Sequence, residues 1–309
     1  MKKKPSKANS GELLTAIRSF IGYLEGTEKS EHTVKNYRLD LLTFQDFLVS
    51  ATPSRSRSKP LARTPNLHQI RPNDIERYQE HLKALGLKTN TRRRKLLTLG
   101  RFLKFTAQRG KLLESLGRKV PAPQKVERVP FTLPWEELLA AIRKLPATSV
   151  IEARNRALLW TLAESGCLVS EATRLRFSDF SGTKLKIPGR AARAIPISVE
   201  LVAEVDTVRA RAGKAPDSPA FVGHNRYGSL GGAISARGIE LLVRSHAERL
   251  GAPEMTPRTF RHSVVAHWLK EGKSRTEIRD LLGLKTEYAF RVFEPILAAR
   301  SSSGTTSTS

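Results

Sequence analysis

A basic stretch without hydrophobic periodicity separates two halves of this chain. It occupies residues 113–130 and contains Pro121, Pro123 and Pro130. Such a composition is typical of an extended linker, because proline cannot continue a helix and scattered charges cannot form a core. The 309 residues therefore predict two domains, each long enough to bury its own hydrophobic core.

The charge of the chain is strongly positive and unevenly distributed. There are 54 Lys and Arg residues against 29 Asp and Glu, a net charge of +25. Residues 1–130 carry +17 and the remainder +8. On a chain with 39% hydrophobic residues, this surplus indicates a folded protein with a polyanionic partner, most often nucleic acid. The alternative is a basic protein whose charge serves only solubility.

Other chemistries find little support in the sequence. Cys167 is the single cysteine, which excludes a disulfide framework and a cysteine metal site. No His, Asp and Glu residues have metal-ligand spacing, so we expect neither a metal nor a cofactor. No apolar run approaches 18 residues and no signal-peptide pattern opens the chain. We therefore expect no membrane partner and a cytoplasmic, nucleoid-associated location.

The first half predicts a helical domain over residues 12–112, preceded by a basic arm at 1–11. Apolar residues keep helical spacing over 12–24, 32–48, 70–85 and 91–110. The fourth of these helices begins with four consecutive cations, and a basic helix start can enter a DNA groove or straddle a backbone. The candidate DNA-binding residues of this half are Lys35, Arg38, Arg92, Arg93, Arg94, Lys95 and Arg101.

The second half predicts a mixed domain over residues 131–297, followed by a disordered Ser/Thr/Gly-rich tail at 298–309. Helical spacing recurs over 151–165, 199–212 and 235–250, while 184–187 and 194–197 alternate like the two strands of a hairpin. The predicted fold class is thus mainly α, with one small β hairpin in the second domain.

A further helix, from Thr256 to Gly272, carries two arginines on one face. Thr256 is an N-cap residue and Pro257 suits the first turn. Arg258 and Arg261 are three residues apart, and two adjacent guanidinium groups near a helix start can bind a phosphate. The alternative is a surface helix with two solvated arginines.

Several stretches of the chain together resemble the tyrosine recombinase (phage integrase) family. In the second half they are Ser165 to Glu171 followed by Leu175 and Asp179, Arg258 to His262, and Leu282 to Leu284. In the first half they are residues 31–41, the helix that contains Asp74 and Ile75, and the helix at 91–110. The resemblance covers residues 12–297. It implies a SAM-like core-binding domain and an α+β catalytic-type domain, which close around duplex DNA like a clamp.

The resemblance also implies which positions would carry the chemistry. Members of the family cleave DNA with a tyrosine nucleophile, assisted by two arginines, a histidine or tryptophan, and a lysine, and a His-x-x-Arg-His helix supplies two of the catalytic residues. Only one catalytic arginine is retained, as Arg261. The other positions carry different residues. Leu168 stands for the first arginine, Arg190 for the lysine, and Arg258 for the histidine three residues before the retained arginine. Leu284 stands for the histidine or tryptophan, and Phe293 for the tyrosine.

These substitutions predict a catalytically inactive member of the family. We expect a double-stranded-DNA-binding accessory or regulatory subunit in site-specific recombination or DNA integration, acting beside an active recombinase or a second copy of itself. One alternative is an active recombinase that uses Tyr288 or a partner's tyrosine; on an α-helix Tyr288 would be displaced from Phe293 by about 140° and 7.5 Å. The other is a non-catalytic scaffold that binds RNA or acidic protein.

Overall fold

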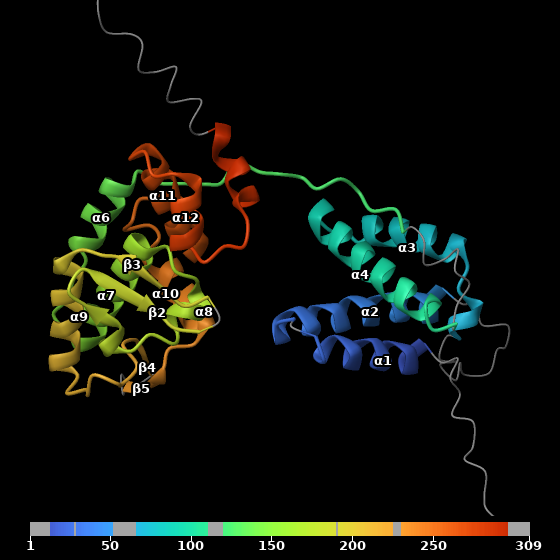
Figure 1. Cartoon of the computed structure of the whole chain (residues 1–309), viewed down its shortest axis with the longest axis horizontal. Coiled ribbons are helices and arrows are strands. Elements are labelled where there is room, and N and C mark those ends of the chain that lie inside the picture. The colour runs from blue at the N-terminus through green and yellow to red at the C-terminus, as the bar shows by residue number, and fades with distance from the viewer. Residues whose placement is uncertain are drawn as a thin grey trace, which may run out of the picture. The chain divides into compact units, whose positions relative to one another are not determined.

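The structure, a computed structural model, describes residues 13–27, 29–51, 66–110, 120–189, 191–224 and 230–295. The predicted basic arm, the predicted tail and Arg190 lie outside these ranges. The chain divides into two compact units, Met1–Glu127 and Arg128–Ser309 (Figure 1). The described residues are mostly helical with two small sheets, which confirms the predicted fold class.

In its described residues, the first unit has four α-helices around an aromatic core. Phe20 packs edge-on against Phe102 and Tyr37, and Phe44 packs edge-on against Tyr78. All five side chains are buried, because each helix turns its apolar stripe inward. The elements are α1 (Leu13–Glu25), α2 (Glu31–Ala51), the 3₁₀ turn η1 (Leu67–Gln69), α3 (Pro72–Ala84) and α4 (Thr89–Ala107).

The beginning of the segment between the units is bound to the first unit. Residues 120–126 are extended, and Val120 and Ala122 pack against the four-helix core. Their backbone polar groups are satisfied by side chains of α3 and α4. The donors are Gln79 to the Pro121 carbonyl (2.7 Å), Arg93 to the Pro123 carbonyl (2.7 Å) and Asn90 to the Val126 carbonyl (2.8 Å).

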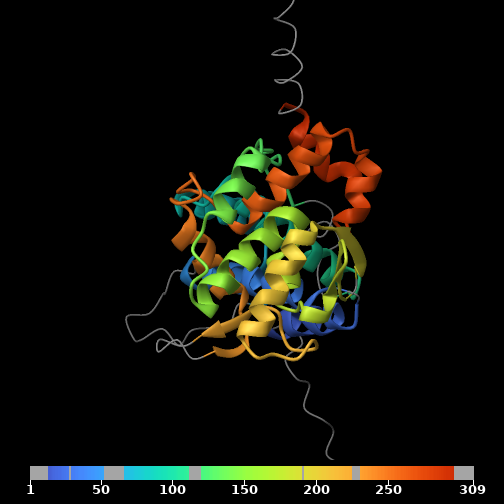
Figure 2. The same ribbon diagram turned by 90° about the vertical axis from the view of Figure 1, so that its left-hand side faces the viewer.

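The second unit is built around one buried helix, α7 (Val150–Ser165). Ser149 and Glu152 form a capping box at its start, and Gly166, with φ of 56°, ends it. It packs against α6 (Trp135–Arg143), α9 (Val199–Arg211) and α11 (Pro257–Lys270) (Figures 1 and 2). The remaining helical elements are α8 (Val169–Ala172), η2 (Phe177–Asp179), α10 (Ala236–His246), α12 (Arg275–Leu281) and the 3₁₀ helix η3 (Glu287–Phe293).

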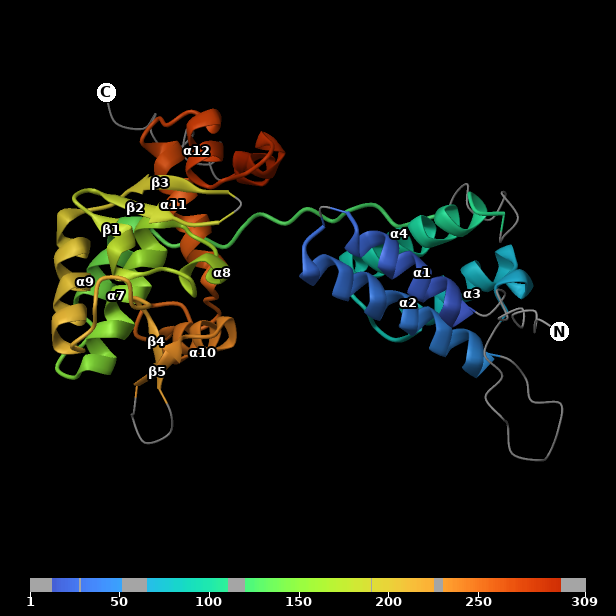
Figure 3. The ribbon, with the colours of Figure 1, turned by 60° about the horizontal axis from the view of Figure 1, so that its bottom comes forward.

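Two small antiparallel sheets complete the second unit (Figure 3). One has the order β1 (Phe180–Ser181), β2 (Lys184–Ile187) and β3 (Arg193–Pro196), with Leu185 opposite Ile195. The other pairs β4 (Val222–His224) with β5 (Leu230–Ala233). The strands β2 and β3 form the hairpin expected from the alternating sequence.

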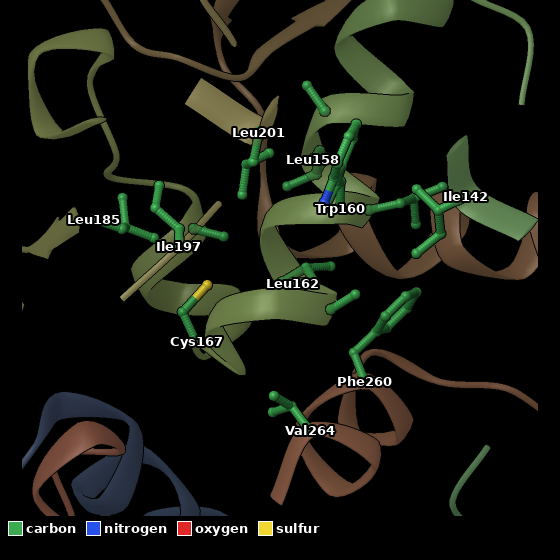
Figure 4. Close-up of a cluster of buried hydrophobic side chains, with 14 of the residues drawn as sticks. Ile142, Leu158, Trp160, Leu162, Cys167, Leu185, Ile197, Leu201, Phe260 and Val264 are labelled. Carbon is green, nitrogen blue, oxygen red and sulfur yellow. The ribbon is translucent and has the colours of Figure 1, made fainter. Parts of the chain in front are cut away.

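The core of the second unit brings distant segments together around α7. Leu158, Trp160 and Leu162 of α7 lie among Leu185, Ile197 and Leu201 on one side and Ile142, Phe260 and Val264 on the other (Figure 4). The buried face of α11 includes Phe260, Val264 and Trp268. Packing of that face against α7 places the start of α11 beside Gly166 at the end of α7.

None of the helices in the described ranges has the length and hydropathy needed to cross a membrane.

Candidate functional site

The start of α11 positions Arg261. The amide N–H of Thr256 donates to Thr259 Oγ1 at 3.1 Å, and Pro257 occupies the first turn, so the helix begins where the sequence indicated. Because Phe260 is completely buried, the helix is fixed in rotation and Arg261 turns toward the end of α7. Arg258, one turn earlier on the same face, is exposed.

The Arg261 side chain joins two segments that are far apart in the sequence. Its Nη1 donates to the Gly166 carbonyl at 2.8 Å and its Nη2 donates to the Leu282 carbonyl at 3.1 Å. Burial lowers the pKa of this guanidinium, and Glu171 counteracts that effect. Arginine nevertheless stays charged at neutral pH, so the site contains a fixed, oriented cation.

A second arginine, Arg193 on β3, lies in the same network. Its two terminal nitrogens donate to the Glu171 carboxylate at 2.7 and 3.0 Å, and its Nε donates to the Leu281 carbonyl at 2.6 Å. Glu171 also accepts from the Leu168 amide at 2.7 Å. Burial raises the pKa of Glu171, but the hydrogen bonds from Arg193 and Leu168 outweigh it and hold the pKa below its usual range.

Glycine 283 permits this close arrangement. Its φ is 62°, and a Cβ there would lie 3.0 Å from Arg193 Nη1 and 3.1 Å from the Ala191 side chain. A side chain at this position would push Arg193 away from Glu171. A glycine therefore suits position 283 because its φ is positive and a side chain there would collide with Arg193.

The positions that the resemblance assigned to catalysis differ in their surroundings. Leu168 is 46% exposed at the start of α8, and Leu284 is partly buried against the core. Phe293 is only 4% exposed, and its ring packs edge-on against His262 with centroids 5.7 Å apart. At the predicted nucleophile position there is thus a buried ring without an oxygen.

His262 is neutral and bound on both sides. Its Nε2 accepts a hydrogen bond from Arg258 Nε at 3.0 Å. Burial, and then the positive charge of Arg258, lower the pKa of His262 to about 4, although a hydrogen bond to the Phe131 backbone acts in the opposite direction. His262 therefore holds Arg258 in one orientation and carries no charge of its own at neutral pH.

The 3₁₀ conformation of η3 changes the geometric relation between Tyr288 and Phe293. The expected displacement assumed an α-helix, but residues 287–293 have three residues per turn. Five residues then correspond to roughly 240° and 10 Å, so the two backbone positions are further apart along the axis than predicted. The side chain of Tyr288 lies outside the described residues.

In the first unit, the predicted DNA-binding residues divide into bound and outward-facing cations. Lys95, a predicted DNA-binding residue, is only 12% exposed and donates to Asp40 Oδ1 at 3.2 Å. Asp40 is buried, and an unpaired buried carboxylate would be costly, so it retains the nearest ammonium group. Arg94 also pairs with Asp40, but its side chain remains 47% exposed.

The other predicted DNA-binding cations of that unit lie on α2 and α4 and are exposed or partly exposed. Lys35 is exposed, and Arg38 is exposed beside Glu25 at 3.2 Å. Arg101 is exposed above the Tyr37 ring, and Arg92 donates to Thr89 Oγ1 at 3.3 Å. The structure therefore brings a charged surface together on these two helices, with Arg93 directed to the Pro123 carbonyl.

Sequence reasoning did not identify Glu171, Arg193 and His262 as members of the site. Glu171 occupies the capping position three residues after Leu168, which was a local signal. Arg193 had no local signal, because it is 22 residues from its partner and reaches it only through the β hairpin.

Groups of three or more metal-ligating side chains do not occur among the described residues.

Known proteins match the sequence of the first unit and most of the whole chain. Residues 17–110 match the model of the phage integrase N-terminal SAM-like domain. Tyrosine recombinase XerC of Chlamydia trachomatis serovar L2 is 27% identical over 289 residues, covering 88% of this chain and 90% of the relative. XerC of Chlamydia muridarum is 28% identical over 294 residues, with the same two coverages.

Solved structures show the same fold over nearly the whole chain. The Tn1549 transposon integrase, in complex with a circular intermediate DNA, matches with a TM-score of 0.66 at 13% identity, covering 95% of this chain and 99% of that one. The XerH site-specific recombinase bound to difH matches with a TM-score of 0.64 at 17% identity, covering 92% and 82%. The fold is that of the integrase-type recombinases. The first unit matches the phage integrase family model, and over most of its length the chain is similar to XerC tyrosine recombinases, as its motifs had indicated.

Proposed function

We propose that this protein is a catalytically silent, duplex-DNA-binding member of the tyrosine recombinase family. It would bind recombination sites in the cytoplasm as an accessory or regulatory subunit. The observation that carries the proposal is Phe293, a buried ring packed on His262 where the family places its nucleophilic tyrosine. Without an ionisable oxygen at this position, the covalent route has no nucleophile.

The other positions that the resemblance assigns to catalysis support the same conclusion. Catalysis by this family requires fixed positive charge where negative charge develops in the transition state, and loss of one such group lowers rates by roughly 10²–10³. Leu168 is an exposed apolar side chain, and Leu284 has neither charge nor a hydrogen-bond donor. Arg258 and Arg261 keep positive charge, which suits binding of a phosphate more than transfer of a proton.

The solved relatives suggest how the protein would assemble on DNA. Lambda integrase has been solved as a dimer on a core site and as a tetramer on a Holliday junction. By analogy, we propose that this chain binds duplex DNA next to an active recombinase or a second copy of itself. In that role its retained basic residues hold the DNA while another subunit supplies the tyrosine.

Binding and covalent attachment should be measured together to test this function. The full-length protein is mixed with duplex fragments from around its own gene, including nicked suicide substrates, and a known active recombinase serves as the positive control. We expect complexes that weaken steeply with salt, since Lys and Arg contacts release counterions, and no SDS-resistant adduct.

Two outcomes would contradict the proposal. An SDS-resistant adduct would show that the protein is an active recombinase, and its loss in a Tyr288→Phe variant would identify the nucleophile. Preference for single-stranded RNA over duplex DNA at matched salt would favour an RNA-binding scaffold instead.

A further inference from the structure

Arg258 and Arg261 differ in what their terminal nitrogens bind. Those of Arg261 donate to the Gly166 and Leu282 carbonyls. Arg258 is exposed and donates through Nε, to His262 Nε2 at 3.0 Å. Within the described ranges, no carboxylate lies within 4 Å of the Arg258 guanidinium. The two terminal nitrogens of Arg258 can therefore donate together to one phosphate.

The ring of His262 is a fixed, neutral acceptor. Because its pKa is about 4, at pH 7 one ring nitrogen carries a proton and the other a lone pair. The hydrogen bond from Arg258 requires the lone pair on Nε2, which leaves the proton on Nδ1 to donate to the Phe131 backbone. The Phe293 ring packs edge-on against the imidazole, with centroids 5.7 Å apart. The imidazole is thus held by contacts with Arg258, Phe131 and Phe293.

A neutral acceptor at this position has a consequence that a carboxylate would not have. Residues four apart on a helix lie on one face, so His262 reaches Arg258 from one turn further along α11. A carboxylate there would neutralise the guanidinium, whereas imidazole orients it and leaves its full charge for a ligand. An exposed arginine loses rotamer freedom when it binds a phosphate, and a side chain that is already fixed loses less.

We propose that His262 is a positioning residue for DNA binding, which fixes the Arg258 guanidinium so that its terminal nitrogens bind one phosphate of the duplex. The Phe131 backbone takes part by fixing which ring nitrogen carries the proton. The inference rests on the proposed function, since it takes duplex DNA as the ligand. His262 would then raise the affinity through geometry and contribute no charge.

The test is duplex binding by the full-length protein over a range of salt concentrations. Arg258→Gln should reduce the magnitude of the slope of log K against log salt by about 0.9, because one phosphate contact is lost. His262→Leu keeps every cation, so it should leave the slope unchanged and weaken binding about three- to tenfold at each salt concentration. In the Arg258→Gln background, His262→Leu should have no further effect, because the residue acts through Arg258.

A conservative variant and a spectroscopic measurement separate positioning from a loss of folding. His262→Gln should restore the wild-type affinity, because its amide oxygen can accept from Arg258 and its NH₂ group can donate to Phe131. Nitrogen-15 NMR of histidine-labelled wild-type protein should show a proton on Nδ1 of His262 and none on Nε2 at neutral pH, with the signals assigned by their absence from His262→Gln. A proton on Nε2 would overturn the inference, since that nitrogen could not accept from Arg258.

His267→Leu is the matched control. His267 also lies on α11 and contacts the start of α6, where its ring stacks on Trp135 with centroids 4.0 Å apart. The variant should bind duplex DNA as the wild type does. Wild-type affinity in His262→Leu, or an equal loss in the Arg258→Gln background, would overturn this inference and leave the proposed function intact. Failure of the wild type to bind duplex DNA would overturn both.

Discussion

Phe293 has a structural role as well as a chemical consequence. Its ring belongs to the core of the second unit and lies against His262. A phenyl ring can be buried there without a polar partner, whereas a phenol would need one for its hydroxyl. A ring without an oxygen therefore suits this buried position, and we expect that Phe293→Tyr alone would not produce cleavage, because Leu168 cannot stabilise negative charge.

Stability should depend on pH through His262. In the unfolded chain its pKa has the ordinary value of 6.5, while in the fold the pKa is about 4. Between these values the unfolded chain binds the proton and the folded chain does not, so stability falls as the pH is lowered from 6.5 to 4. We expect a loss of roughly 2 kcal/mol after allowance for partial exposure, measured by urea denaturation across this range.

The control for this prediction is His262→Gln, which cannot titrate. The variant should lose less stability than the wild type between pH 6.5 and pH 4. Parallel curves for the two proteins would show that other groups cause the pH dependence.

The Glu171 and Arg193 pair should contribute more to stability than an exposed ion pair. Their side chains are 14% and 8% exposed, and removal of one partner leaves the other buried without compensation. We expect Glu171→Gln to lower the free energy of unfolding by about 3 kcal/mol at pH 7. The exposed pair of Glu25 and Arg38 is the matched control, and Glu25→Gln should change it by less than about 1 kcal/mol.

The contribution of Glu171 to the free energy of unfolding should also disappear in acid. Its folded pKa lies below the ordinary value of 4.5, so the carboxylate stabilises the fold above that pH and loses the effect as the pH falls through the folded pKa. The difference between wild type and Glu171→Gln should therefore shrink in denaturation experiments at about pH 3. A difference that stays constant with pH would contradict this assignment.

At the scale of elements, the junction of α7 and α11 depends on a glycine. Gly166 has φ of 56°, and a Cβ there would lie 2.7 Å from Val264 Cγ1. We expect Gly166→Ala to destabilise the protein by about 2–4 kcal/mol, from backbone strain and steric overlap together, as measured by thermal or urea unfolding. Gly272, with φ of 84° and open space around it, is the control, and Gly272→Ala should cost only about 1 kcal/mol.

The spacing of apolar residues predicted most helices and strands. Tertiary packing decided where some of them end and that η3 is a 3₁₀ helix. The strand at 184–187 was predicted with the bounds observed, and the α11 start at Pro257 followed from its cap and proline. The helix expected to reach Leu250 ends at His246. The 3₁₀ form of η3 was not anticipated, because its short apolar spacing is compatible with either helix type.

At the scale of the whole molecule, residues 120–126 of the segment between the units are bound to the first unit. The Asn90 amide forms two hydrogen bonds with the Val126 backbone. We expect Asn90→Ala to release residues 120–126 from the first unit, since each lost bond contributes about 1 kcal/mol. Hydrogen exchange of the Val126 amide should rise severalfold, while the core of the four-helix unit keeps its protection.

The control is Asn73→Ala, which removes an exposed asparagine of α3. It should leave exchange in residues 120–126 unchanged. Equal exchange in the wild type and Asn90→Ala would show that Gln79 and Arg93 alone hold the segment.

The sequence by itself determined what depends on local pattern and residue identity. Helical periodicity predicted the helices, the charge surplus predicted a polyanionic partner, and the absence of an oxygen at Phe293 follows from the side chain alone. Tertiary structure alone decided which cations are bound and which face outward. Lys95 is 55 residues from Asp40, Arg193 is 22 from Glu171, and Arg261 is 95 from Gly166. Such contacts form only when the chain packs, because burial of a carboxylate or carbonyl requires whichever donor the fold brings near it.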